Sequence, residues 1–209
     1  MKNMNWANRV TLLRILFIPV FLVVLLSPWP AYFPAPALWI AAQPWIAALV
    51  FALVAATDAV DGYLARSRNE VTTFGKFIDP LADKLLVTAA LIALVDLGRL
   101  PSWVALVIIS RELIVSGLRM VAVAEGKVIA ASWFGKVKTI LQIAAILGFI
   151  VMGSPVFDSV AGPGSGNTMT LITWAVMILA LIFTVLSMLD YFYHARDVIT
   201  GPWNGGELK

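Results

Sequence analysis

Long apolar runs alternate with short polar or Pro- and Gly-rich segments along the whole chain. Six runs stand out, at residues 12–27, 45–64, 80–97, 103–124, 136–152 and 169–193. Most of them approach the roughly 20 apolar residues that a helix needs to cross the hydrocarbon core of a bilayer. The pattern therefore predicts an all-α integral membrane protein, with six transmembrane helices in a single membrane-embedded domain over residues 1–209.

The segments between these runs have the composition of connections. Residues 28–44 are rich in Pro and Trp, and residues 67–77 form a polar link. Residues 153–167 include the sequence GPGSGN, which favours turns over helix. We therefore expect each apolar run to end where these segments begin.

Composition narrows the class of protein further. Of the 209 residues, 61% are hydrophobic and 13% are charged, whereas soluble domains carry about 25% charged residues. A water-soluble globular enzyme is excluded, and the six runs leave no room for a separate soluble domain. The net charge of +3 is too small to indicate a nucleic-acid partner. The absence of Cys removes disulfides, thiolate nucleophiles and Cys-ligated metals.

Basic residues divide unevenly when the connections are assigned alternately to the two sides of a membrane. One side carries Lys2, Arg9, Arg66, Arg68, Lys76, the segment 125–138, Arg196 and Lys209. The other side carries only Arg99. The positive-inside rule then places both termini and the link 67–77 in the cytoplasm.

Four carboxylates interrupt the apolar pattern. Asp58 and Asp61 lie near the end of the second run, and Asp79 and Asp83 lie at the start of the third. A carboxylate at the bilayer centre costs about 2.5–3.5 kcal/mol, so these acids need compensation. Their spacings place each pair on one helix face. Together they predict a cytoplasmic-side site for two hard divalent cations, Mg²⁺ or Mn²⁺.

Two alternatives stay open at this point. The acids could instead form salt bridges with Arg66, Lys76 and Lys84. Gly62 and Ala65 share the stripe of Asp58 and Asp61, and small residues there allow either a bulky ligand or only close helix packing.

The pattern D-x2-D-G-x2-A-R-x8-G-x3-D-x3-D resembles the complete signature of the CDP-alcohol phosphotransferase family. Its fixed positions here are Asp58, Asp61, Gly62, Ala65, Arg66, Gly75, Asp79 and Asp83. The resemblance implies a six-helix bundle in which the four Asp hold two divalent cations on a CDP diphosphate. It also implies that Asp83 is the general base on the acceptor hydroxyl. The CMP moiety would be lined by Gly62, Ala65, Arg66 and Gly75.

Three further stretches resemble the branch of this family that joins CDP-diacylglycerol to glycerol 3-phosphate. They are Asn8-x2-Thr11-x2-Arg14, Ser110-Arg111-Glu112 leading to Arg119, and residues 131–139. The resemblance implies that Asn8 and Thr11 bind CDP-diacylglycerol. It also implies a homodimer in the bacterial inner (cytoplasmic) membrane, surrounded by membrane lipids. For Arg14 an alternative is that its side chain extends to lipid headgroups.

Basic residues within or beside apolar runs also favour a phosphate-bearing acceptor, because they need an anionic partner. The candidates for binding the acceptor phosphate are Arg111, Arg119, Lys136 and Lys138. Alternatively, these residues pair with Glu112, Glu125 or lipid phosphates.

Two rival functions remain. An acceptor such as serine, inositol phosphate or phosphatidylglycerol would keep the enzyme class, although an acceptor without phosphate leaves the basic residues without a common anion. A divalent-cation transporter would place ionisable groups across the whole membrane depth, whereas these acids lie toward one face.

The absence of native Cys makes the predicted sidedness testable with single introduced cysteines. Positions within 28–44 and 153–167 should react with a membrane-impermeant reagent added to intact cells, and Ser67→Cys should not. Labelling of Ser67→Cys from outside would contradict the cytoplasmic placement of the link.

Overall fold

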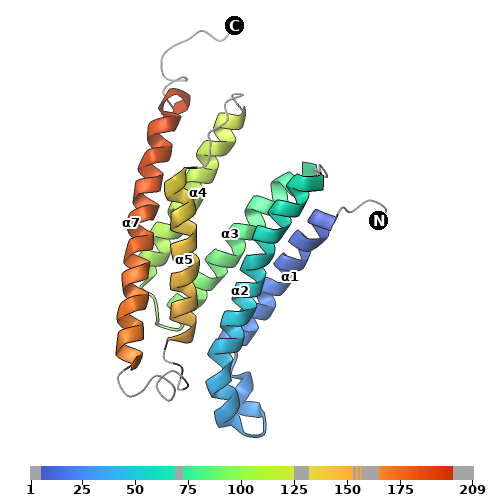
Figure 1. Ribbon diagram of the computed structural model, residues 1–209, viewed down its shortest axis with the longest axis vertical. Helices are drawn as coiled ribbons and strands as arrows, with labels where there is room; N and C mark the ends of the chain where they lie inside the picture. The colour runs from blue at the N-terminus through green and yellow to red at the C-terminus, as the bar shows by residue number, and fades with distance from the viewer. Residues whose placement is uncertain are drawn as a thin grey trace. The chain divides into compact units, whose positions relative to one another are not determined.

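The structure is a computed structural model that describes residues 6–68, 73–124, 132–152, 154, 156 and 165–199. Side chains are described within residues 12–57, 84–123, 132–152, 154, 156 and 166–196. Within these ranges all regular structure is helical (Figure 1). The elements are α1 (Trp6–Leu26), the 3₁₀ helix η1 (Trp29–Tyr32), α2 (Pro36–Arg68), α3 (Thr73–Asp96), α4 (Ser102–Ala124), α5 (Trp133–Val151) and α7 (Ser165–Ile199). The six α-helices correspond one to one to the apolar runs, so the predicted all-α architecture is confirmed.

Large apolar side chains cover much of the outer surface. Leu16, Leu106 and Leu171 are 70%, 65% and 72% exposed, which suits contact with lipid rather than water. Three helical segments of the described chain are long and apolar enough to cross a membrane: Pro36–Thr57, Trp133–Val151 and Gly166–Arg196. The protein is a membrane protein, and complete spans by α1, α3 and α4 remain a prediction.

All three connections described above are shorter than the sequence pattern predicts. Residues 153–167 were expected to be a connection, but α7 begins at Ser165, within the GPGSGN sequence. Residues 28–44 were expected to be a connection throughout, but α2 begins at Pro36. Proline suits the first helical position, where its missing N–H is not needed and its φ is already helical. The polar link expected at 67–77 is also shorter, because only residues 69–72 separate the ends of α2 and α3. Apolar runs mark the part of a helix that contacts lipid. The helix itself can continue into polar sequence, because its backbone hydrogen bonds do not depend on lipid.

The chain forms two compact units. Unit 1 comprises residues 1–101 and 146–173, and unit 2 comprises residues 102–145 and 174–209. In unit 1, α1 contacts both α2 and α3. Phe21 and Phe51 are fully buried there, with ring centroids 5.5 Å apart. In unit 2, the ring of Phe183 lies against Trp133 and Phe134, at centroid distances of 6.3 and 6.2 Å.

Two side chains in unit 1 satisfy carbonyl groups at helix ends. The amide of Gln43 donates hydrogen bonds to the carbonyls of Val24 and Ser27, each at 2.9 Å. Val24 lies in the last turn of α1 and Ser27 follows its end, where carbonyl groups have no partner within the helix. Gln43 therefore ties the start of α2 to the end of α1.

Arg99, in the turn between α3 and α4, donates hydrogen bonds to the carbonyl groups at the end of α5. Its Nη1 donates to the carbonyls of Phe149, at 3.1 Å, and Ile150, at 2.7 Å. A cation is favourable at this end of a helix, where the carbonyl dipoles leave partial negative charge. Burial lowers the pKa of the Arg99 guanidinium, yet arginine keeps its proton in proteins. Gly98 allows the tight turn, because its φ of +65° is unfavourable for other residues.

Candidate active site

All eight positions of the aspartate signature lie on helical backbone. Asp58, Asp61, Gly62, Ala65 and Arg66 belong to the last turns of α2, and Gly75, Asp79 and Asp83 belong to the first turns of α3. Their side chains lie outside the described ones. The backbone therefore establishes only where these residues lie along the two helices.

This placement puts the two pairs of aspartates at similar depths. Figure 1 shows that α2 ends where α3 begins, so the two helices run in opposite directions within unit 1. With a rise of 1.5 Å per residue, Asp61 lies about 10 Å before the end of α2, and Asp79 lies about 9 Å after the start of α3. Asp58 and Asp83 each lie about 15 Å from the same ends. The signature thus occupies one end of the α2–α3 hairpin.

The donor set suits hard divalent cations. Carboxylate oxygens are the ligands that Mg²⁺ and Mn²⁺ prefer, and four of them fall within three helical turns of one hairpin end. Among the side chains that the structure describes, no group of three or more His, Cys, Asp or Glu residues could hold a metal ion. The chemistry of their carboxylates makes the signature aspartates candidates for a metal site.

The predicted ligands of CDP-diacylglycerol on α1 are described unequally. Asn8 and Thr11 lie in the first turns of α1, and their side chains are outside the described ones. Arg14, one turn further on, is only 3% exposed. The alternative that Arg14 extends to lipid headgroups is therefore wrong, because its side chain is enclosed within unit 1.

The four predicted acceptor-binding residues separate into two kinds within unit 2. Arg111 and Lys138 are buried, at 6% and 3% exposed, and both contact Glu112. Arg111 Nη1 lies 3.0 Å from Glu112 Oε1, and Lys138 Nζ pairs with the same oxygen. The alternative of pairing with Glu112 is confirmed for these two residues. Arg119 and Lys136 are exposed.

Two polar residues of α7 complete the surroundings of Arg111, and the sequence pattern did not identify them. Arg111 Nη2 donates to the fully buried Ser187 Oγ. The guanidinium carbon lies 5.7 Å from the ring centroid of Tyr191. Arg111 Nε has no hydrogen-bond partner within the described part of the chain. The sequence signal for this contact is weak. Ser187 and Tyr191 are four residues apart in a largely apolar run, so they share one helix face.

Asp190 and His194 lie on the same helix. His194 Nδ1 is 3.3 Å from Asp190 Oδ1, one turn away. The imidazole side chain is 60% exposed. Ion pairs near the protein surface contribute little to stability. The Asp190–His194 pair therefore serves as a reference for the buried contacts of Glu112 with Arg111 and Lys138.

Comparison with known proteins decides the family. The model of the CDP-alcohol phosphatidyltransferase family matches residues 4–186. The chain belongs to this family. The match includes both the aspartate signature and the four basic candidates, and members of the family generally use divalent cations.

Three relatives resemble the chain along most of its length. A CDP-diacylglycerol--glycerol-3-phosphate 3-phosphatidyltransferase of Bacillus subtilis (strain 168) is 43% identical over 197 residues, 90% of this chain and 93% of the relative. A probable phosphatidylglycerophosphate synthase of Mycobacterium tuberculosis (strain ATCC 25618 / H37Rv) is 39% identical over 93% of this chain and 83% of its own. The Escherichia coli (strain K12) enzyme with the same name as the first is 36% identical over 92% and 95%.

The shared carboxylate of Glu112 leads to a stability prediction for this phosphatidyltransferase-family protein. Glu112→Gln removes the anion between Arg111 and Lys138 and leaves two buried cations. Breaking a buried ion pair from one side costs about 3–5 kcal/mol, so we expect a loss of that size in the free energy of unfolding. Denaturant unfolding in a defined detergent measures it.

Asp190→Asn is the matched control, because it removes the exposed pair with His194. It should change the free energy of unfolding by less than about 1 kcal/mol. Equal effects of the two variants would show that the Glu112 cluster carries no special share of the stability of unit 2.

Proposed function

We propose that the protein transfers the phosphatidyl group of CDP-diacylglycerol to sn-glycerol 3-phosphate, forming phosphatidylglycerophosphate and CMP. The proposal is supported by the complete aspartate signature at one end of the α2–α3 hairpin. It is supported equally by relatives named for this activity, which are 36–43% identical over nearly the whole chain. The acceptor hydroxyl oxygen forms a bond to the phosphatidyl phosphorus, and the bond from that phosphorus to the CMP oxygen breaks.

In this proposal Asp58, Asp61, Asp79 and Asp83 hold two divalent cations, Mg²⁺ or Mn²⁺. When bound, such cations neutralise a diphosphate and stabilise the CMP leaving group. Asp83 accepts the proton of the acceptor hydroxyl. A carboxylate is a weak base in water, but it suffices when the hydroxyl is held within hydrogen-bond distance. The nucleotide lies along Gly62, Ala65, Arg66 and Gly75, with Asn8 and Thr11 also contacting CDP-diacylglycerol.

The phosphate of the acceptor is bound by the basic residues of unit 2. Arg111 brings a buried guanidinium whose Nε has no hydrogen-bond partner among the described residues, and Lys138 pairs with Glu112 beside it. Arg119 and Lys136 are exposed and can approach an anion from water. Charge-assisted hydrogen bonds to phosphate are among the stronger polar contacts. Serine and phosphatidylglycerol would bind these basic residues less well, because neither carries a phosphate monoester.

We further propose that both termini and the aspartate site face the cytoplasm and that the protein works as a homodimer. The first part is supported by the distribution of Lys and Arg, and the second by family resemblance alone. Native mass spectrometry of the detergent-solubilised protein tests the dimer. The transporter alternative is disfavoured, because the aspartates gather at one end of one hairpin instead of lining the membrane depth.

Asp83→Asn tests whether Asp83 acts mainly in proton removal rather than in holding a cation. If it does, the amide, which keeps the shape of the carboxyl group but removes its basicity, should reduce turnover below detection and change CDP-diacylglycerol binding by less than about threefold. Asp58→Asn is the comparison, and it should weaken lipid-nucleotide binding and metal dependence together. CMP release and equilibrium binding of CDP-diacylglycerol are the two measurements. Turnover near the parent level in Asp83→Asn would remove Asp83 from the role of base.

Arg119→Gln tests the acceptor side without disturbing the buried cluster. A charge-assisted hydrogen bond contributes about 1.5–3 kcal/mol, so KM for glycerol 3-phosphate should rise roughly ten- to a hundredfold. KM for CDP-diacylglycerol should stay within about twofold. Arg119→Lys should give a smaller effect, since it keeps the charge but loses the planar fork.

Arg196→Gln provides the control for that experiment. Arg196 is also exposed and lies over the ring of Tyr193, at 5.3 Å from its centroid. Its removal should leave KM for glycerol 3-phosphate unchanged. Unchanged acceptor kinetics in folded Arg119→Gln protein would exclude this residue from the acceptor site.

A further inference from the structure

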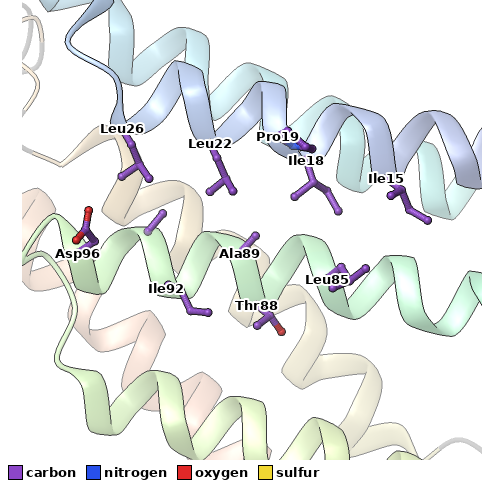
Figure 2. A pocket seen from close by; sticks show the side chains of 11 residues that line it. Ile15, Ile18, Pro19, Leu22, Leu26, Leu85, Thr88, Ala89, Ile92 and Asp96 are labelled. Atoms are coloured by element: carbon purple, nitrogen blue, oxygen red, sulfur yellow. The ribbon is translucent and has the colours of Figure 1, made fainter.

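An apolar groove of about 570 Å³ lies between α1 and α3 within unit 1 (Figure 2). On α3 its lining includes Leu85, Thr88, Ala89 and Ile92, which recur every three or four residues and so form one stripe. On α1 a second stripe includes Ile15, Ile18, Leu22 and Leu26. Figure 2 shows the two sets of side chains along facing stretches of the two helices.

Small side chains explain why space remains between two helices that contact each other. Thr88 and Ala89 occupy the middle of the α3 stripe, between the larger Leu85 and Ile92. On α1 the compact ring of Pro19 lies in the middle of the facing stripe. Leu85 and Ile92 are 42% and 57% exposed, so the groove opens to the outer surface of unit 1.

The length and polarity of the groove suit a hydrocarbon chain. Leu85 and Asp96, which mark the ends of the lining on α3, are eleven residues apart, about 16 Å at 1.5 Å per residue. This length is about half of the roughly 30 Å hydrocarbon core, and so about one leaflet of a bilayer. Thr88 and Asp96 are the polar residues of the lining. The carboxylate of Asp96 marks one end, because a methylene chain gains nothing beside a charged group.

The opposite end of the groove lies at the level of the aspartate signature, because Leu85 follows Asp83 on α3 by about 3 Å along the helix axis. The groove lines another face of α3 than Asp79 and Asp83 do, since a step of two residues turns the helix by about 200°. On α1, by contrast, Asn8 and Thr11 share the stripe of Ile15, Ile18 and Leu22, whose members recur every three or four residues. A lipid whose headgroup contacts Asn8 and Thr11 would therefore have its chains at the mouth of this groove. A bulk lipid has no such headgroup contact to fix its position.

We propose that the α1–α3 groove binds one acyl chain of CDP-diacylglycerol during transfer. The assignment rests on the proposed function for the identity of the headgroup. It explains why this stretch of α3 combines small residues with an open apolar surface. The groove then contributes to the binding of the lipid substrate and makes no contact with the acceptor.

Filling the groove is the first test, in the full-length protein in mixed micelles. Ala89→Phe places a ring in the middle of the groove. Displacing about two methylene groups corresponds to roughly tenfold in affinity, so KM for dioleoyl CDP-diacylglycerol should rise about tenfold. KM for a short-chain, dibutanoyl CDP-diacylglycerol and for glycerol 3-phosphate should stay within about twofold.

Ala52→Phe is the matched control. Ala52 is also a partly buried alanine in a helix of unit 1, but it does not line the groove. It should leave all three constants within about twofold. Equal KM changes for the long- and short-chain substrates in Ala89→Phe, or the same pattern in Ala52→Phe, would overturn the assignment.

Photolabelling gives a readout that does not depend on turnover. CDP-diacylglycerol with a diazirine in one acyl chain should label peptides covering residues 15–26 and 85–96. Excess unlabelled CDP-diacylglycerol should suppress this labelling, and phosphatidylcholine with the same chains should not. Equal suppression by phosphatidylcholine would show that the groove holds bulk lipid, and labelling elsewhere would show that the chain binds elsewhere; either result overturns the proposal.

The two experiments separate this assignment from the proposed function. If CDP-diacylglycerol suppresses labelling of the groove but the protein does not transfer to glycerol 3-phosphate, the acyl-chain site is supported and the proposed acceptor is rejected. Normal transfer by Ala89→Phe, with labelling outside the groove, would reject the chain site and retain the transferase.

Discussion

Charge in a bundle surrounded by hydrocarbon must be compensated close at hand, and much of this structure follows from that constraint. Within unit 2, one carboxylate, Glu112, serves two buried cations, Arg111 and Lys138. Within unit 1, the guanidinium of Arg99 is compensated by the carbonyl groups that end α5. The four aspartates of α2 and α3 are the remaining large concentration of charge. In the proposed function, divalent cations offset the charge of these carboxylates.

The same constraint explains what the sequence could predict. Charges are rare in a chain with 13% charged residues, so each one within an apolar run signals a partner or a ligand. The signature aspartates and the basic candidates were found in this way. Six helices followed from six apolar runs for an equally simple reason, since only helices and closed barrels satisfy the backbone in lipid.

The rest depended on information that hydropathy does not carry. The beginning of α2 at Pro36, before Pro44, is fixed by backbone hydrogen bonds and by the contacts of Gln43 with the end of α1. The partners of Arg111 on α7 depend on which faces of two helices meet, and this is a property of packing. Arg14 illustrates the same point: its place in an apolar run is compatible with a headgroup contact, but the packing of unit 1 encloses it.

Arg99 also constrains the order in which the protein can be completed. The residues that accept its hydrogen bonds, Phe149 and Ile150, come 50 and 51 residues later in the chain. At about 5–20 residues per second, the ribosome needs roughly 3–10 s to synthesise that stretch. Until then α1, α2 and α3 are present, and the α3–α4 turn is held by its own backbone hydrogen bonds to α3, but Arg99 lacks these two acceptors. Unit 1, which is discontinuous in sequence, can therefore be completed only after α4 and most of α5 have been synthesised.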